Sequence, residues 1–188
     1  SHTITSPRVS ETLDAGRPTA CNLCHLDKTL EWTGRHLHEW FGQPLPELED
    51  RHKTIATAAL MALEGDAAQR AIVTWAMSWP PAVQASEAAT WAPAYLSRLL
   101  DDPYDPVRYM AGRSLSRFPA YAGFDYDFLA AKPALTDAAD RALAIWEHGD
   151  HGSTPRPAVL VGSSGKLDRD KFAASYARRN DRRIYLRE

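Results

Sequence analysis

The chain has 188 residues, 44% of them apolar, so it can bury the core of one domain or of one domain with an appendage. Its 22 basic and 24 acidic residues leave a formal net charge of −2, which argues against a nucleic-acid-binding protein and against binding to an anionic membrane surface. No apolar run approaches the length of a membrane span, so we expect no transmembrane segment.

Residues 1–20 are rich in Thr, Ser and Pro and predict an extended lead. The only two cysteines follow directly, in the pentapeptide Cys21-Asn-Leu-Cys24-His25. This C-x-x-C-H motif is the attachment signature of a c-type haem. Each thiol adds to one haem vinyl group, and the two intervening residues let one helical turn bridge the two vinyls. The motif predicts one haem c, covalently bound to Cys21 and Cys24, with His25 as the proximal axial ligand of the iron.

A C-x-x-C pair is also compatible with other chemistry. A structural zinc site needs four ligands, which His36 and His38 could complete, although their spacing is short for a zinc-finger loop. A thioredoxin-type pair follows a strand in a βαβ unit, and no such pattern surrounds Cys21. A chance occurrence is the third alternative.

A helix is predicted to begin near Cys21 and to run from Asp27 towards Trp40, where Gly42 and two prolines end it. Its apolar positions recur at helical spacing on one face: Leu30, Thr33, Leu37 and Trp40. The six tryptophans of the chain are expected mainly to pack between helices, although some could surround a haem.

The segment from about residue 50 to 150 contains an internal repeat. The stretch DAAQRAIVTW from Asp66 and the stretch DAADRALAIW from Asp137 agree at six of ten positions. Between them lies DPYDPVRYMAGRSL, and the three stretches place Arg70, Arg108 and Arg141 at intervals of about 35 residues. Such a period predicts three helical units stacked as an α-solenoid, with an irregular helical bundle as the alternative.

The middle unit is the clearest of the three. Leu96, Leu99 and Leu100 line its first helix, and Pro106 opens its second at a position where the missing N–H costs nothing. The predicted inner face of that second helix comprises Val107, Met110, Ala111, Ser114, Leu115 and Phe118. The Asp-Pro-Val-Arg opening resembles a HEAT repeat, although the period is shorter than usual for that class.

These patterns divide the chain into three parts. Residues 1–48 are predicted to be a haem c-binding segment, and residues 49–150 HEAT-like helical repeats. Residues 151–188 are predicted to hold a linker and a C-terminal helix or tail, with a linker or surface loop over 152–165 and a helix over 167–179. The fold class predicted is therefore all-α, a short haem-binding segment followed by a HEAT-like α-solenoid.

Four stretches together resemble the C-terminal region of periplasmic multihaem c-type cytochromes: SHTITSP (1–7), GRPTACNLCHLDKTLEWT (16–33), EWFG (39–42) and DPYDPVRY (102–109). The resemblance covers most of residues 1–128 and is most specific around the C-x-x-C-H motif. It implies haem binding and electron transfer outside the cytoplasm, with a redox partner protein or upstream haem domains as partners. This chain holds a single C-x-x-C-H motif, so any further haem of a longer parent would lie upstream. No signal-peptide pattern opens the sequence, although haem c is attached outside the bacterial cytoplasm, so we expect the chain to be a mature product or an excised fragment.

The motif does not itself specify the distal ligand of the iron. On a continuous helix, His36 and His38 would lie about 16–20 Å from His25 along the axis, too far to face it across one haem. The remaining candidates are His2, His52 and Met61, with a bent-back His36 as a further alternative and an open or water-bound site as another. The resemblance favours His2, whose place in the Ser-His lead suits an axial ligand.

Three functions are compatible with these patterns. An electron-transfer cytochrome in the periplasm, rather than an enzyme, is the leading one. A haem enzyme acting on peroxide or nitrogen oxides would need an open distal site with a polar group such as Arg17, His36 or His52. A protein-binding solenoid with a structural haem is the third.

Overall fold

A computed structural model describes residues 6–182 of the chain, and in that part it is all-helical, with no strands. The predicted all-α class is thereby confirmed. The first helices are α1 (Val9–Ala15), α2 (Ala20–Cys24), α3 (Leu30–Phe41), α4 (Asp50–Thr54), α5 (Thr57–Leu63) and α6 (Ala67–Ala76). They are followed by α7 (Pro80–Ser86), α8 (Ala92–Leu99), α9 (Asp105–Leu115), α10 (Lys132–His148) and α11 (Arg169–Tyr176).

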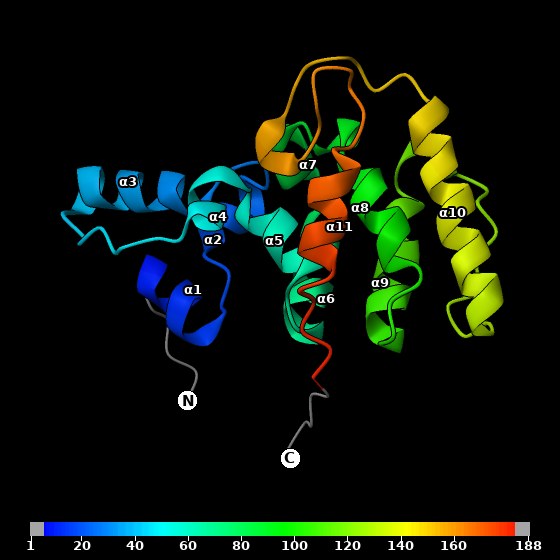
Figure 1. Ribbon diagram of the computed structural model, residues 1–188, viewed down its shortest axis with the longest axis horizontal. Helices are drawn as coiled ribbons and strands as arrows, with labels where there is room; N and C mark the ends of the chain where they lie inside the picture. The colour runs from blue at the N-terminus through cyan, green and yellow to red at the C-terminus, as the bar shows by residue number, and fades with distance from the viewer. Residues whose placement is uncertain (1–5, 183–188) are drawn as a thin grey trace.

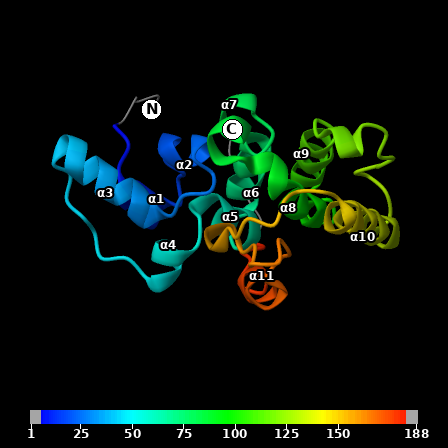
Figure 2. The same cartoon turned by 90° about the horizontal axis from the view of Figure 1, so that it is seen from above.

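The helices form an extended arrangement with α3 at one end and α10 at the other (Figure 1). The helix α8 packs against both α5 and α10, while α6 packs against α9. Seen from above, α11 lies on one side of the row formed by α5, α8 and α10, and α9 lies on the other (Figure 2). Among residues 6–182, no helix combines the length and the apolar character that crossing a membrane requires.

The middle unit is built as its apolar pattern predicts. Leu96, Leu99 and Leu100 are fully buried along α8, and the predicted inner face of α9 is buried except for Met110, which is half-buried. Pro106 stands in the first turn of α9, as expected for a residue that has no N–H to satisfy. The α8–α9 hairpin is therefore the centre of the core.

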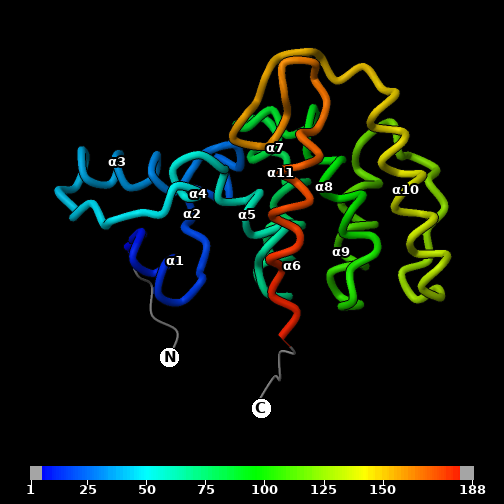
Figure 3. The backbone as a smooth tube through the Cα atoms, in the orientation of Figure 1, coloured from blue at the N-terminus to red at the C-terminus, as the bar shows by residue number. Residues whose placement is uncertain are grey.

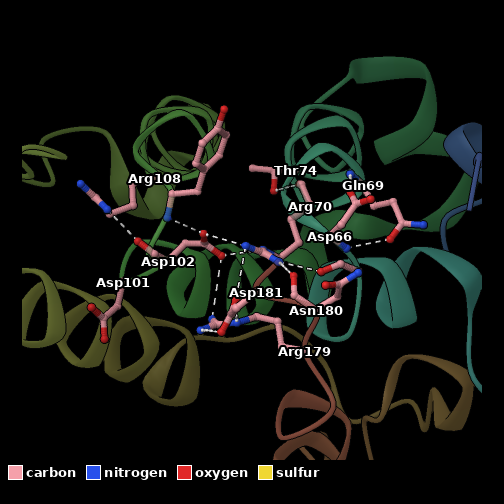
Figure 4. A network of polar contacts seen from close by, with 12 residues as sticks. Asp66, Gln69, Arg70, Thr74, Asp101, Asp102, Arg108, Arg179, Asn180 and Asp181 are labelled. Carbon is pink, nitrogen blue, oxygen red and sulfur yellow. Dashed lines mark hydrogen bonds and ion pairs between the residues drawn. The ribbon is translucent and has the colours of Figure 1, made fainter. Parts of the chain in front are cut away.

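Arg70 and Arg108 hold equivalent places in two successive hairpins (Figure 4). Arg70 on α6 donates to the carbonyl of Gly65, in the turn between α5 and α6, at 2.6 Å. Arg108 on α9 donates to the carbonyl of Asp102, in the turn between α8 and α9, at 2.8 Å. Each arginine also reaches the next unit, because Arg70 binds the Asp102 carboxylate and Arg108 binds the carbonyl of Phe128.

The third unit differs from the expected helical hairpin. Residues 132–148 form one continuous helix, α10, which packs against α8. Arg141 therefore lies in the middle of that helix, where it is exposed and pairs with Asp137 one turn earlier. Although residues 137–146 match residues 66–75 in sequence, Arg141 is not a third buried arginine. At this site the matching Asp and Arg form an exposed i, i+4 ion pair, and the shared alanines belong to a continuous helix.

Residues 152–165 are more closely attached to the core than a linker or surface loop would be. After α10 the chain runs back over one end of the helices towards α11 (Figure 3). Its exposed residues flank Val159, Leu160 and Val161, which are buried in the large core. The Tyr95 hydroxyl donates to the Val159 carbonyl at 2.9 Å, which satisfies a backbone group that burial would otherwise leave unpaired.

The basic stretch after α11 is attached to the helices by ion pairs and hydrogen bonds. Arg178 forms an ion pair with Glu64 at 2.6 Å, and the N–H of Asn180 donates to the Glu64 carbonyl. The carbonyl of Asn180 accepts from Arg70 at 3.1 Å. These contacts bind residues 178–181 to the turn between α5 and α6.

Candidate functional site: the C-x-x-C-H motif

The C-x-x-C-H motif is built on the short helix α2. Thr19 is its N-cap residue, and its hydroxyl oxygen accepts from the N–H of Asn22, which satisfies one of the free donors at a helix start. The backbone N–H of His25 donates to the Cys21 carbonyl at 2.7 Å. His25 thus follows immediately on the helical turn that carries both cysteines.

Asn22, between the two cysteines, fixes α2 to its surroundings. It is almost fully buried, and its side-chain oxygen accepts from the hydroxyls of Thr19 and Thr33, both at 2.9 Å. Its amide nitrogen donates to the Lys28 carbonyl at 3.2 Å. One buried side chain therefore connects α2, α3 and the loop after His25, a role that the sequence pattern alone did not reveal.

The two cysteines lie on a partly exposed side of α2. Both are half-buried, and both are free thiols. Three residues apart on one helix, they are surface neighbours with Cβ atoms about 5–6 Å apart. Leu26, directly after His25, is fully buried in the large core. The motif is therefore anchored from beneath while its thiols stay accessible.

The His25 imidazole begins a series of ring contacts along α3. The ring centroids of His25 and Trp32 are 5.1 Å apart, and those of Trp32 and His36 are 4.4 Å apart. The His36 ring in turn stacks on that of Trp40, with a centroid distance of 4.8 Å. Trp32, His36 and Trp40 are spaced four residues apart and share one face of the helix. This aromatic stripe was missed because tryptophans were expected to serve mainly as packing. Trp40, predicted to lie on the buried face with Leu30 and Leu37, is instead 62% exposed.

The predicted helix from the cysteines towards Trp40 is in fact two helices. Residues 25–29 separate α2 from α3, so His25 and His36 are not on one axis. The argument that placed His36 about 16–20 Å from His25 therefore fails, because the Trp32 ring contacts both imidazoles. That indole lies against both rings, so His36 can face His25 across a haem only if Trp32 moves.

The other candidate distal ligands lie elsewhere. His2 is outside the described residues. His52 and Met61 line one cavity of about 170 Å³, together with Leu30 and Thr57 but with none of the C-x-x-C-H residues. Arg17, proposed for an open distal site, is exposed.

The electrostatics of His52 differ from those of an ordinary surface histidine. Burial lowers its pKa, and so does the neighbouring Arg51 charge, while Glu49 and Glu64 act in the opposite direction. Its Nδ1 atom is buried without a hydrogen-bond partner. The folded environment therefore disfavours the charged form of His52, which lines a small cavity together with Leu30 of α3.

The motif fits a covalently bound haem in three respects. Its two thiols are free and adjacent, its His25 ring makes no hydrogen bond within residues 6–182, and Asn22 holds the turn in place. In the same part of the chain, no three His, Cys, Asp or Glu side chains gather into a group able to hold a metal ion. No protein-family model, curated protein or solved structure matches this chain, so the interpretation of the motif rests on its own residues and their geometry.

Proposed function

We propose that this chain is a c-type cytochrome, or part of one, that carries one haem c and transfers electrons. The observation that carries the proposal is the geometry of α2, which presents two free thiols one turn apart, followed directly by an imidazole that no group of residues 6–182 hydrogen-bonds. A haem bound there supplies a one-electron Fe(II)/Fe(III) couple. The environment proposed is the periplasm or another extracytoplasmic compartment, where such attachment takes place.

Different residues around α2 would attach the haem, ligate its iron and hold the motif in place. Cys21 and Cys24 fix the position of the haem by two covalent bonds, and His25 supplies the proximal nitrogen. Asn22 keeps the turn from shifting, since its three side-chain hydrogen bonds connect α2 to α3 and to Lys28. Trp32 packs beside the His25 ring and restricts its rotation. As distal ligand, His2 remains our prediction.

We also propose that α5–α6 and α8–α9 are HEAT-like repeats that present a surface to a redox partner protein or to upstream haem domains. The equivalent placements of Arg70 and Arg108 support this assignment, because each connects its own turn to the following unit. Stacked repeats of this kind offer an extended surface for docking. In this account the haem lies at one end of the repeats.

The experiment is the visible spectrum of protein made in a host that attaches haem c, compared between wild type, His25→Ala and His38→Ala. The proposal expects a c-type spectrum in wild type, a changed axial-ligand spectrum in His25→Ala and no change in His38→Ala. His38 is the matched control because it is an exposed histidine on α3 whose ring, within residues 6–182, hydrogen-bonds only to the Gln43 carbonyl. A wild-type protein without haem absorbance, from cells that mature a control cytochrome, would overturn the proposal.

The same spectra test the distal ligand. His2→Ala should convert a low-spin iron to high-spin iron that binds carbon monoxide, because removing an axial ligand opens the sixth position. An unchanged low-spin spectrum would transfer the role to His52, Met61 or His36. Carbon monoxide binding by the unaltered protein would instead favour an open-site haem enzyme.

A further inference from the structure

A second cavity lies far along the chain from the C-x-x-C-H motif, between α8, α10 and α11. It has a volume of about 300 Å³. Leu143, Leu167 and Phe172 supply its large apolar walls, and three alanines leave the space between them. Such a mainly apolar cavity with a few charged groups is the usual form of a small-molecule site.

Arg98 is the unusual group in this cavity. Its guanidinium lies over the ring of Tyr176 at 4.2 Å, and the guanidinium of Arg179 lies over the same ring at 4.5 Å. Arg179 also pairs with Asp181, whereas Arg98 forms no hydrogen bond or ion pair within residues 6–182. Arg98 is nevertheless half-buried. It therefore presents several N–H donors without an acceptor in a place only partly open to water.

The charges around the cavity favour an anion. Its lining contains two arginines, Arg98 and Arg169, and one carboxylate, Glu147. Glu147 pairs with Arg169, so the charge of Arg98 remains uncompensated. A planar guanidinium whose orientation is fixed by stacking on an aromatic ring suits a carboxylate, which it can bind through two parallel hydrogen bonds.

We propose that this cavity binds a monocarboxylate with a short hydrocarbon chain. The carboxylate accepts hydrogen bonds from Arg98, and the chain packs against Leu143, Leu167 and Phe172. At about 30 Å³ for each water-sized group, the cavity accommodates about ten non-hydrogen atoms, which is the size of octanoate. The site is independent of the haem motif, and its test does not depend on haem binding.

The test is calorimetric titration of the protein with octanoate and with 1-octanol, using wild type, Arg98→Gln and Arg113→Gln. We expect octanoate to bind wild type and to bind Arg98→Gln at least about tenfold more weakly, since the variant loses hydrogen bonds between two charged groups. The affinities of wild type and Arg98→Gln for the neutral 1-octanol should differ much less. Arg113 is the matched control, because it is an exposed arginine on α9 that does not line this cavity and whose guanidinium donates to the Tyr109 hydroxyl.

A second variant tests the apolar part of the site. Ala173 is exposed on α11 and lines the cavity, so Ala173→Leu should fill part of the space without disturbing the fold, and circular dichroism checks that the helices remain. Octanoate binding should fall in this variant. Absence of octanoate binding to wild type, equal weakening in Arg113→Gln, or undiminished binding in Ala173→Leu would each overturn the proposal.

Discussion

Two hydrophobic clusters divide the described residues unevenly. A small cluster is formed by residues of α1, α3 and the segment after α3: Val9, Leu30, Leu37 and Leu48. One large cluster extends along the chain from Leu26 to Val161. The C-x-x-C-H motif adjoins the large cluster, since Leu23 packs against it and Leu26 belongs to it, whereas Leu30 at the start of α3 belongs to the small one. The C-x-x-C-H motif is thus anchored on the more extensive core, while the aromatic stripe of Trp32, His36 and Trp40 extends from it along a helix supported by only a few apolar residues.

The difference in apolar burial predicts which regions resist local opening and which open readily. Buried apolar contacts determine how far a region resists local opening, so α8 and α9, whose buried apolar residues belong to the large cluster, should open last. The end of α3 should open more readily, because its terminal Trp40 and Phe41 are 62% and 71% exposed. The large cluster therefore fixes the position of the C-x-x-C-H motif, whereas the exposed end of α3 can move relative to it.

The largest effect is expected at the buried ion pair between Arg70 and Asp102, whose Nε and Oδ2 atoms are 2.7 Å apart. Arg70→Met should lower the free energy of unfolding by about 3–5 kcal/mol, because it leaves the buried Asp102 charge with no basic partner closer than Arg179, at 3.9 Å. Adding Asp102→Asn should recover part of the loss by removing that charge. Arg141→Met, at an exposed pair, should cost less than about 1 kcal/mol. Equal losses in chemical denaturation would contradict the assigned difference between the two arginines.

The two cores are compared directly by Leu99→Ala and Leu37→Ala. Leu99 is 1% exposed in the large cluster, and its truncation should cost about 2–5 kcal/mol of global stability. Leu37→Ala should instead raise hydrogen exchange in α1 and α3 while the α8 and α9 amides stay protected. If Leu37→Ala raised exchange in α8 and α9 as well, the small cluster would not be separable from the large one.

Asn22→Ala tests how α2 is attached. The variant leaves the buried Thr33 hydroxyl without its acceptor and removes one of the two donors to the Lys28 carbonyl, which keeps the Thr57 N–H; this should cost about 1–3 kcal/mol. The loss should appear as faster exchange of the α2 amides. Asn180→Ala is the control, because the contacts of Asn180 with Glu64 and Arg70 use its backbone, so it should leave α2 unaffected.

The helices themselves could be largely predicted from the sequence, and their tertiary roles only in part. Apolar spacing placed the α8–α9 hairpin, and the recurrence of Arg70 and Arg108 indicated equivalent positions. Arg141 does not occupy an equivalent position, although it continues the sequence repeat. A match over ten residues does not show whether the arginine binds the carbonyl of a neighbouring turn, as Arg70 and Arg108 do. The buried segment from Val159 to Val161 was missed because Gly, Pro and Ser around it are typical of exposed loops.

At the motif, the pattern identified Cys21, Cys24 and His25 but not what holds or surrounds them. The hydrogen bonds of Asn22 join residues of two helices, and no local pattern predicts such a contact. The break between α2 and α3 was missed because Asp27 and Lys28 are compatible with a helix, whereas the N-cap bond of Thr29 to Trp32 starts a new one. That error also placed His36 too far from His25.

The smallest effect concerns pH. Because the pKa of His52 is lowered in the folded protein, the unfolded chain binds a proton there more readily, and stability falls as pH drops below about 6.5. His52→Gln removes this contribution, so its thermal midpoint should fall less than that of wild type between pH 7.5 and 5. A steeper fall in the variant would contradict the direction of the shift. All other titrating groups are common to both proteins.

The most direct test of the central claim is the mass of the denatured protein from a host that attaches haem c. The account predicts a polypeptide heavier by one covalently retained haem, with Cys21→Ala and Cys24→Ala each able to form only one of the two thioether bonds and the double variant retaining none. A wild-type mass equal to that of the bare polypeptide would contradict the proposal that the C-x-x-C-H motif of this chain carries a haem.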